Sequence, residues 1–553
     1  RGGGIGVSDW LSQARQALQS GDLPKTERLC REALAANARD FDGHYLLAIV
    51  HMQRGALLDA ERSFGEAAKT NPRSLDALYS RGAALQSLNR DEEALACFDK
   101  ALLLRPGIPE IVNARGNALM ALNRCSDALT CFDLVLRTNP SSPGVWNNRA
   151  NALAALGRQT EALTCYDKAL ALVPGHTGIL NHRAITLFEL KRYEEAARDF
   201  AAVLKSDPGH PYALGNLAQA RRHCCDWREH RETAASLAAR LRAGEEAMTP
   251  VQANVFAMTP EEQYLASRSW AEKKCPAAPP LRKGERYEHR KIRIAYLSAD
   301  FHSHATAALI AGVFEAHDRS RFETWAVSYG PDDGSPMRAR LKGAFDRFID
   351  VRDYTDAAIA KLLRQSEIDI AVDLKGYTQD ARPGILAHRP APVQASYLGF
   401  PGTMGADYID YFIADGVVAP TEHARWYGEK LVHLPDSYQC NDSKREIAAR
   451  TPLRGEAGLP EAGFVFCSFN NSYKIAPEIF AVWMRLLKSV EGSVLWLLDD
   501  NAAAVRNLRR EAESSGVAGT RLVFAPRANL DYHLARHRLA DVFLDTLPCG
   551  AHT

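Results

Sequence analysis

A period of 34 residues runs through the first part of this chain and constrains its fold more than any other feature. Prolines recur at that interval, and aromatic residues keep the same spacing in another phase. The prolines are Pro72, Pro106, Pro140, Pro174 and Pro208, and the aromatics are Phe64, Phe98, Phe132, Tyr166 and Phe200. Such a period is typical of repeat arrays, in which each unit buries its apolar face only against its neighbours. The sequence therefore predicts a continuous superhelix for this part of the chain.

Each repeat reads as two helices. In residues 77–110, apolar side chains recur at steps of three and four on both sides of a turn around Asn89. The proline follows the second helix and ends it, because proline has no N–H to donate. We predict an all-α array over residues 9–230, followed by a helical connector and a proline-rich linker over 231–290.

The first helices of the repeats carry asparagines at the same period. These are Asn113, Asn147 and Asn181, with Asn117, Asn148 and Asn151 nearby. The amides could satisfy hydrogen bonds between neighbouring repeats. They could also line the concave surface as a ladder that grips the backbone of an extended peptide, since an amide both donates and accepts. The second interpretation predicts a peptide groove and a protein partner.

After residue 290 the pattern changes to short apolar or β-branched runs that alternate with helical segments, which predicts parallel sheets. Two such series predict two Rossmann-like domains, over 291–437 and 455–553, with a crevice at the carboxyl ends of their strands. The expected strands are 292–298, 322–330, 368–374 and 393–400, then 463–470, 493–500, 521–526 and 541–546. Because the chain stops soon after a strand, we expect the second domain to be incomplete.

Composition excludes some classes of partner. The formal net charge is +1, so no overall field favours nucleic acid or an anionic membrane. The longest apolar run, Ala305–Phe314, is half the length of roughly 20 residues that a membrane helix needs. Three of the 11 cysteines, Cys97, Cys131 and Cys165, repeat at the 34-residue period. Buried free cysteines of this kind predict a reducing, cytoplasmic setting.

Polar clusters follow the predicted strands, where folds of this type bind ligands. In NNSYKIAP, a strand ends near Asn470, Lys474 lies in the loop, and a helix with Pro477 in its first turn follows. PCGAHT, at the end of the chain, has the same layout. A lysine beside a helix N-terminus suits the oxygens of a diphosphate, although each segment could also be a simple helix cap. No Gly-x-x-x-x-Gly-Lys-Ser/Thr occurs in the sequence.

The segment LSADFHSHAT places His302 and His304 directly after a strand. The pair could bind a metal, could be structural, or could supply a catalytic or substrate-orienting imidazole. A metal site needs three or four ligands, and no third ligand lies close in the sequence. We therefore predict no metal site, and a catalytic or orienting role is the interpretation that we favour.

Together these segments resemble one family. The 34-residue units resemble tetratricopeptide repeats, and the α/β part contains YLSADFHSHAT, LKGYTQDAR, APVQASYLGFPGTMG, FCSFNNSYKIAP and LADVFLDTLPCGAHT. The chain is similar over nearly its whole length to the O-linked N-acetylglucosamine transferases, and to bacterial homologues because the family's large insertion between the catalytic halves is absent. The resemblance implies an all-α tetratricopeptide superhelix followed by an α/β GT-B-type glycosyltransferase. It also implies UDP-N-acetylglucosamine (UDP-GlcNAc) as donor, Ser/Thr of proteins or peptides as acceptor, inversion at the anomeric carbon, and no metal or other cofactor.

The resemblance assigns site residues as well. The histidine of the family's DFxxH motif lies at the active site and is His304 here, and the motif lysine that meets the donor diphosphate is Lys474. Further substrate contacts are implied for Asn471, Ala528, His533, Arg536, His552 and Thr553. The repeat asparagines Asn113, Asn147 and Asn181 would then form the acceptor-peptide groove.

Two positions depart from the family's pattern. Asp369 stands where another active-site histidine is expected, and Leu530 stands where a lysine near the uridine is expected. These departures leave open a transferase that uses UDP-glucose or modifies Asn. They also leave open a tetratricopeptide scaffold whose catalytic half is degenerate.

Overall fold

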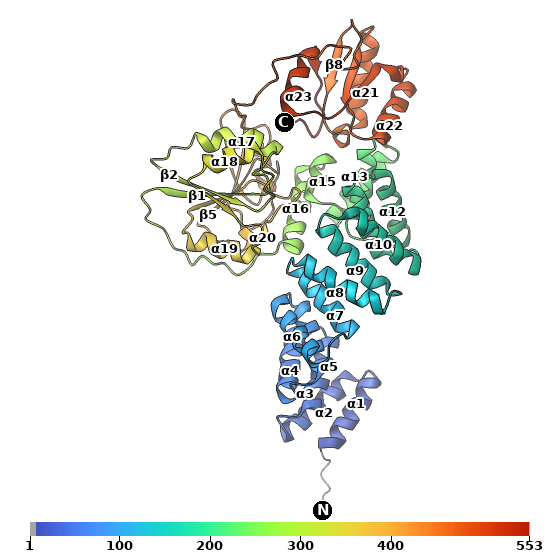
Figure 1. Cartoon of the computed structure of the whole chain (residues 1–553), viewed down its shortest axis with the longest axis vertical. Coiled ribbons are helices and arrows are strands. Elements are labelled where there is room, and N and C mark those ends of the chain that lie inside the picture. The colour runs from blue at the N-terminus through green and yellow to red at the C-terminus, as the bar shows by residue number, and fades with distance from the viewer. Residues whose placement is uncertain (1–6, 552–553) are drawn as a thin grey trace, which may run out of the picture. The chain divides into compact units, whose positions relative to one another are not determined.

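The computed structural model describes residues 7–551, so the predicted substrate contacts His552 and Thr553 lie outside the described residues. The chain divides into two compact units, Arg1–Leu190 and Lys191–Thr553. Among the described residues, the first unit contains helices only, and the second contains further helices and two parallel sheets (Figure 1).

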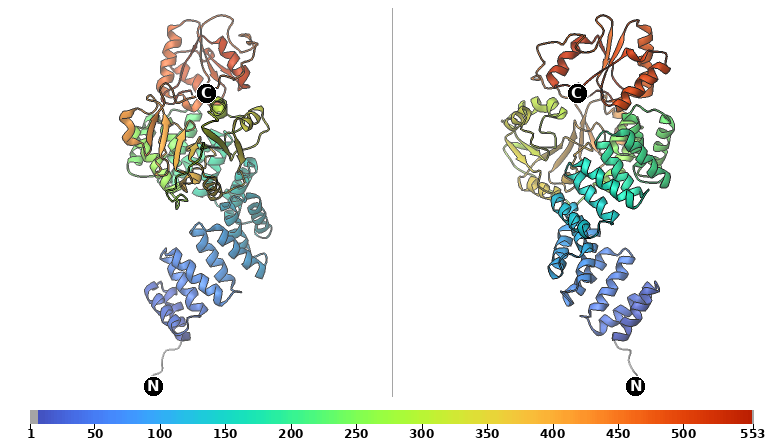
Figure 2. Two further views of the ribbon diagram at one scale, coloured as in Figure 1. Left: turned by 90° about the vertical axis from the view of Figure 1, so that its left-hand side faces the viewer. Right: turned by 45° about the vertical axis from the view of Figure 1, so that its right-hand side comes forward.

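In the first unit, helices follow one another as antiparallel pairs (Figure 2). They are α1 (Val7–Gln19), α2 (Leu23–Ala36), α3 (Phe41–Gln53), α4 (Leu57–Thr70), α5 (Leu75–Ser87), α6 (Asp91–Leu104), α7 (Pro109–Ala121), α8 (Cys125–Thr138), α9 (Pro143–Ala155), α10 (Gln159–Leu172) and α11 (Thr177–Glu189). The turn within each pair is set by a residue with positive φ at the 34-residue period. Those of this unit are Gly21, Gly55, Asn89, Asn123 and Gly157. Glycine and asparagine tolerate that backbone region best, so the period fixes the turns as well as the helices.

The period also explains the packing between the helices. A Cβ placed on Gly82 or Gly116 would lie 2.5 Å from the ring of Phe98 or Phe132, so in these two repeats the aromatic of the second helix fits against a glycine of the first. The recurring cysteines are free and buried. Cys131 accepts a hydrogen bond from the Arg115 guanidinium at 3.2 Å, and Cys165 accepts one from Arg149 at 2.9 Å.

The second unit begins with helices that lead into the α/β part. They are α12 (Tyr193–Ser206), α13 (Ala213–His223), α14 (His230–Arg242), α15 (Pro250–Val255) and α16 (Pro260–Lys274). Capping boxes at Thr249 and Thr259 start α15 and α16, because each threonine accepts from the third helical residue, whose side chain accepts in return. The helices that end the repeat sequence therefore belong to the same compact unit as both sheets.

The first sheet has seven parallel strands in the order β3-β2-β1-β4-β5-β6-β7. Their bounds are β1 (Ile292–Ser298), β2 (Phe322–Ser328), β3 (Arg347–Asp350), β4 (Ile370–Asp373), β5 (Val393–Tyr397), β6 (Tyr411–Ala414) and β7 (Lys430–His433). The four strands predicted from sequence are confirmed, whereas β3, β6 and β7 were not predicted. The strand order reverses between β1 and β4, whose Leu297 and Asp373 are paired. The loops that leave these two strands therefore start side by side.

Helices cover both faces of this sheet (Figure 1). One face packs against α17 (Ala305–Glu315) and α18 (Pro336–Ala344), and the other packs against α16, α19 (Asp356–Gln365) and α20 (Gly384–Ala387). Along β1, Ile294 and Tyr296 face the first group while Ala295 and Leu297 face the second. The strand is apolar on both faces, as expected for a buried parallel sheet.

The second sheet has four parallel strands in the order β10-β9-β8-β11. These are β8 (Val465–Ser468), β9 (Val494–Leu498), β10 (Leu522–Ala525) and β11 (Val542–Phe543), with helices α21 (Pro477–Ser489), α22 (Ala502–Ser514) and α23 (Leu530–Arg536) between them. All four predicted strands are confirmed. The short 3₁₀ turns Ser472–Lys474 and His537–Leu539 follow β8 and α23.

Candidate active site

The loop after β1 brings His304 to the start of α17. Its main chain is extended, and its Nδ1 accepts a hydrogen bond from the Thr306 N–H at 3.2 Å, which makes His304 the N-cap of that helix. The side chain is 40% exposed. Partial burial lowers the pKa of His304 below its usual value, Asp300 opposes this shift, and Lys375 and His302 add to it.

A buried ion pair lies beneath His304. The Lys375 ammonium donates to both oxygens of Asp300, at 2.8 and 2.9 Å, and both residues are about 95% buried. Lys375 leaves β4, so the pair joins the two strands between which the sheet reverses. Asp373 accepts from the backbone N–H groups of Lys375 and Gly376, and burial raises the pKa of its carboxyl to about 6. We call Asp300, His304, Asp373 and Lys375 the charged wall.

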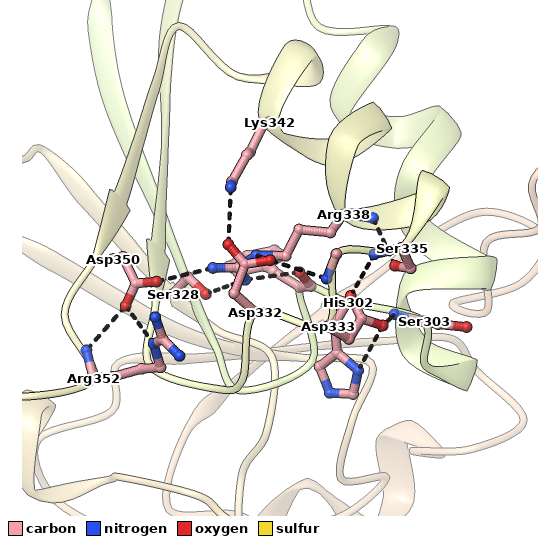
Figure 3. A network of polar contacts seen from close by, with 12 residues as sticks. His302, Ser303, Ser328, Asp332, Asp333, Ser335, Arg338, Lys342, Asp350 and Arg352 are labelled. Carbon is pink, nitrogen blue, oxygen red and sulfur yellow. Dashed lines mark hydrogen bonds and ion pairs between the residues drawn. The ribbon is translucent and has the colours of Figure 1, made fainter.

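His302 points to a different set of partners. Its Nδ1 lies 3.8 Å from Asp333, which also accepts from the Ser303 N–H at 2.9 Å (Figure 3). In the same network Arg338, 1% exposed, donates to the Phe301 carbonyl at 2.9 Å. It also donates to Ser328 and Asp350. These contacts fasten the loop after β1 to the loop before α18 and give His302 a structural setting.

On the second sheet, the loop after β8 holds the predicted diphosphate contacts. Lys474 is 8% exposed, and its ammonium donates to the Gly550 carbonyl at 2.8 Å, so the two predicted phosphate-binding segments touch. Asn470 donates to Asp545 and Thr546, which precede the second segment. Asn471 accepts from Arg527 at 2.7 Å.

The end of α13 holds this loop from behind. The Ser472 hydroxyl donates to the His223 carbonyl at 2.8 Å, and the Arg222 guanidinium donates to the Tyr473 carbonyl at 2.9 Å. Cys225 donates to the Ser472 carbonyl at 3.6 Å. His223 is buried at this contact, and the centre of its ring lies 4.8 Å from the centre of the Tyr473 ring. The residues just before Lys474 are therefore fixed by the last helix of the repeat sequence.

α23 supplies His533 and Arg536, which meet Phe469 at the end of β8. The Arg536 guanidinium lies 4.2 Å from the centre of the Phe469 ring and donates to the Pro526 carbonyl and to Nδ1 of His533. Burial, with Arg536 and His537 as further causes, lowers the pKa of His533 to about 4. Since Trp496 and His537 also pack on Phe469, we call Phe469, Trp496, His533, Arg536 and His537 the aromatic wall.

The charged wall and the aromatic wall meet at one cavity of about 660 Å³. Both His304 and His533 line it, as do Asn470 of the loop after β8 and Ala551 of the loop after β11. The other lining residues are Ser303, Ala305, Ala308, Met337, Arg445, Ile447, Phe469, Leu530, Leu534, His537 and Phe543. Lys474, Asn471, Ala528 and Arg536 do not line the cavity: Lys474 and Arg536 are buried behind it, and Ala528 is exposed on the loop before α23.

Arg445 is the one arginine or lysine among these lining residues, and it was not among the predicted site residues. It lies in the segment between β7 and β8, which is fixed at both ends. Asp442 pairs with Arg340 of α18 at 2.6 Å, and the Ala448 N–H donates to the Asp531 carbonyl of α23. The only feature of the sequence that marks this segment is the stretch CNDSKRE, which is charged and has no helical period.

The two departures from the family's pattern have different surroundings. Asp369 precedes β4, at the opposite end of that strand from Asp373, and it binds the Arg293 N–H at 2.9 Å and His289 at 3.1 Å. Its identity therefore does not change the cavity. Leu530 lines the cavity and is 45% exposed, so it adds an apolar contact where a cation was expected.

The repeat asparagines lie on first helices, as predicted, and several bond to neighbouring repeats. Asn148 donates to Asn113 at 3.2 Å and to Asn117 at 3.0 Å, and His182 bonds to Asn147 at 3.0 Å. The Asn181 side-chain oxygen is buried without a hydrogen bond to any described residue. Inter-repeat bonds thus account for some of these amides, and the peptide groove stays a prediction.

Within residues 7–551, no group of three or more His, Cys, Asp and Glu side chains could hold a metal ion. None of the helices in that range is both long and apolar enough to span a bilayer.

Two parallel α/β sheets whose strand-end loops share one cavity, preceded by helical repeats, define a repeat-bearing protein with a GT-B-type glycosyltransferase fold. The sequence profile described as Glycosyl transferase family 41 matches residues 278–451 and 447–553. Tetratricopeptide-repeat profiles match residues 75–108, 113–177 and 182–223. The chain belongs to glycosyl transferase family 41, the O-GlcNAc transferase family.

Several known proteins are similar to this chain. A probable UDP-N-acetylglucosamine–peptide N-acetylglucosaminyltransferase of Arabidopsis thaliana, SEC, is 41% identical over 269 residues, which are 48% of this chain and 28% of that protein. The corresponding Caenorhabditis elegans enzyme is 26% identical over 376 residues, 48% of this chain and 33% of its own length. The chain therefore spans about a third or less of these relatives. A mutant of the Thermobaculum terrenum O-GlcNAc transferase matches with a TM-score of 0.49 and 24% identity, over 86% of this chain and 79% of that one.

Proposed function

We propose that this protein transfers N-acetylglucosamine from UDP-GlcNAc to Ser or Thr hydroxyls of proteins. The observation that carries the proposal is the shared cavity, which brings His304 of the first sheet together with His533 and the diphosphate loops of the second. In a GT-B-type fold the donor and the acceptor meet at such a strand-end crevice. The names of the relatives, which specify UDP-N-acetylglucosamine and peptide, support the same donor and acceptor.

In this proposal, charged groups contact the diphosphate of the donor and uncharged groups contact its nucleobase. Lys474, with the backbone N–H groups where α21 begins, stabilises negative charge that develops on the departing diphosphate. Phe469 and the neutral His533 offer flat surfaces that suit a nucleobase, because neither of these aromatic groups brings a full charge to it. Asn471 and the chain around Ala528 lie at the same strand ends and supply polar contacts.

His304 contacts the acceptor hydroxyl in this proposal. The transfer is a single displacement: the hydroxyl oxygen bonds to the anomeric carbon while the bond from that carbon to the diphosphate oxygen breaks, the hydroxyl proton passes to an oxygen of the departing diphosphate, and UDP leaves. A positioned neutral imidazole holds that hydroxyl in line with the anomeric carbon, which lowers the entropic part of the barrier. The repeat asparagines Asn113, Asn147 and Asn181 hold the acceptor backbone.

The test starts with Lys474→Ala, which should abolish transfer from UDP-GlcNAc to protein, as read by mass spectrometry of the modified acceptor. Lys488→Ala, an exposed lysine on α21 of the same half, serves as the matched control and should leave transfer unchanged. Equal activity of Lys474→Ala and the parent would remove Lys474 from the mechanism.

The donor and the acceptor residue need a separate measurement. Calorimetry with UDP-GlcNAc and UDP-glucose should show tighter binding of the first, and tighter binding of UDP-glucose would overturn the choice of sugar. Modified residues should be Ser and Thr, and modification of Asn would overturn the choice of acceptor. If the complete protein did not bind UDP at millimolar concentration, it would be a scaffold instead.

A further inference from the structure

The two nitrogens of His304 have different surroundings, and the difference starts at Nδ1. The Thr306 N–H donates to Nδ1 at 3.2 Å. A nitrogen that accepts a hydrogen bond carries no proton, so the proton of the neutral ring must be on Nε2. Among the residues that the structure describes, none hydrogen-bonds to Nε2, and the ring faces the cavity. His304 therefore presents Nε2–H to whatever occupies that space.

The Asp300 carboxylate would normally favour the opposite tautomer. Its Oδ2 lies 3.3 Å from Nδ1, within ion-pair distance, yet no hydrogen bond joins the two atoms. A carboxylate this close draws a proton onto the facing nitrogen when its charge is unopposed, as an opposite charge stabilises the protonated form. Another charged group must therefore offset the effect of the Asp300 carboxylate on the ring.

Lys375 is the group that does so. Its ammonium binds both oxygens of Asp300, and the Thr306 hydroxyl donates to Oδ2 at 3.1 Å. Lys375 is 4% exposed and the Asp300 side chain is 7% exposed, so solvent screens the charges of this pair little. The other titratable groups near the ring are His302 and Asp380, and Arg445, His533 and His537 face it across the cavity.

We propose that the Asp300–Lys375 pair is a positioning device that keeps His304 in the Nε2–H tautomer, so that the imidazole gives the substrate a hydrogen-bond donor rather than a proton acceptor. Lys375 and Asp300 touch no open part of the cavity and act only through His304. The idea rests on the proposed transferase function for its consequence in catalysis. The tautomer itself can be measured without any substrate.

The direct test is nuclear magnetic resonance of the full chain with ¹⁵N-labelled histidine, with the His304 signals assigned by their loss in His304→Gln. At pH 7.5 the parent should show a protonated Nε2 and a bare Nδ1. A protonated Nδ1 in the parent would overturn the proposal, and this result requires no variant to fold.

Lys375→Met provides the second arm. Removing the ammonium should protonate Nδ1 and raise the pKa of His304 by about one unit or more, because the buried carboxylate then faces the ring unopposed. The double variant Asp300→Asn with Lys375→Met removes both charges and should return the pKa toward the parent value. A folded Lys375→Met with the parent tautomer and pKa would contradict the proposal.

Kinetics separate a donor from a base. Gln can place an amide N–H near the position of Nε2, so His304→Gln should retain at least about tenfold more turnover than His304→Ala if the ring acts as a donor. Equal loss in both variants would indicate a proton acceptor and overturn the proposal. Failure of the parent to bind UDP would instead refute the transferase function while leaving the tautomer result standing.

Discussion

The charged wall and the aromatic wall face the same cavity but are built on different physics. Behind His304 lies a buried ion pair of Asp300 and Lys375, which joins two neighbouring strands. Behind His533 lies the Arg536 guanidinium, stacked on Phe469 and bonded to a carbonyl and a neutral imidazole, with no carboxylate partner among residues 7–551. One wall therefore places a pair of opposite charges behind its imidazole, and the other places a single cation and aromatic ring faces against its imidazole.

The difference shows how one cavity can serve two tasks. A buried charged network is costly to desolvate, and removal of one partner destabilises the protein strongly. In return, the network fixes the protonation and orientation of its side chains. An aromatic platform tolerates change better and suits a flat, uncharged group of a ligand. The wall that we propose contacts the acceptor hydroxyl and the wall that we propose holds the nucleobase are thus expected to respond differently to substitution.

The largest effect is expected on the charged wall. Asp300→Ala leaves the Lys375 ammonium buried without its partner, which should lower the free energy of unfolding by about 3–5 kcal/mol. Chemical denaturation measures this, with Asp353→Ala, an exposed carboxylate of the same half, as control. A loss no larger than that of the control would show that the pair is not desolvated and would remove the contrast between the walls.

A smaller effect is expected on the aromatic wall. Arg536→Met keeps most of the stacked volume but removes the bonds to the Pro526 carbonyl and to His533. The free energy of unfolding should fall by about 1–3 kcal/mol. The pKa of His533 should rise, because the nearby cation is one reason why it is low. Denaturation and histidine titration measure the two quantities. An unchanged pKa would show that the Arg536 charge does not lower the pKa of His533.

The pH dependence of stability gives a third comparison. The pKa of His533 is about 4 in the folded protein, so between the ordinary value of 6.5 and 4 the unfolded chain takes up a proton that the folded chain does not. The free energy of unfolding should therefore fall as pH drops through that window, and it should be unaffected by His533 above it. His223, with a pKa of about 4 through burial, acts with the same sign.

His533→Gln should make this fall shallower, and the remaining slope should include the contribution of His223. Denaturation curves at intervals from pH 7 to pH 4 measure the slope. An identical slope in the parent and in His533→Gln would show that water reaches the aromatic wall more freely than its packing indicates.

The smallest effect is expected for Thr306→Val. The variant loses the hydroxyl bond to Asp300 at 3.1 Å but keeps the N–H that reaches His304. Stability should fall by less than about 1.5 kcal/mol, and the His304 tautomer should not change. A change of tautomer in Thr306→Val would mean that the hydroxyl, and not Lys375, balances Asp300.

Much of the fold could be predicted because its signals are local. The 34-residue period determines the helices, their turns at positions such as Asn89, and the contact of Phe98 with Gly82. The apolar runs determine eight strands. β3, β6 and β7 were not predicted. β3 (RFID) and β7 (KLVH) are the edge strands of the first sheet and mix charged with apolar residues, so neither forms the apolar run that marks a buried strand.

The site could be predicted only in part. The position of His304 after β1 and that of Lys474 after β8 follow from strand-end placement, and the resemblance to the family named them. Arg445 could not be selected, because the segment between the sheets has no period and its place at the cavity depends on bonds to α18 and α23. Lys375 stood in a strand-end segment, KGYTQDAR, but nothing in the sequence paired it with Asp300.

The sequence by itself determined the repeat array, the two α/β series and the family to which the chain belongs. The tertiary structure alone decided which strand-end groups meet. β1 lies beside β4, so Asp300 and Lys375 form an ion pair although 75 residues separate them. α13 lies behind the loop after β8, so Ser472 bonds to His223 across 249 residues. Period and propensity act over a few residues, whereas strand order and packing bring distant residues together, and the chemistry of this cavity depends on such distant pairs.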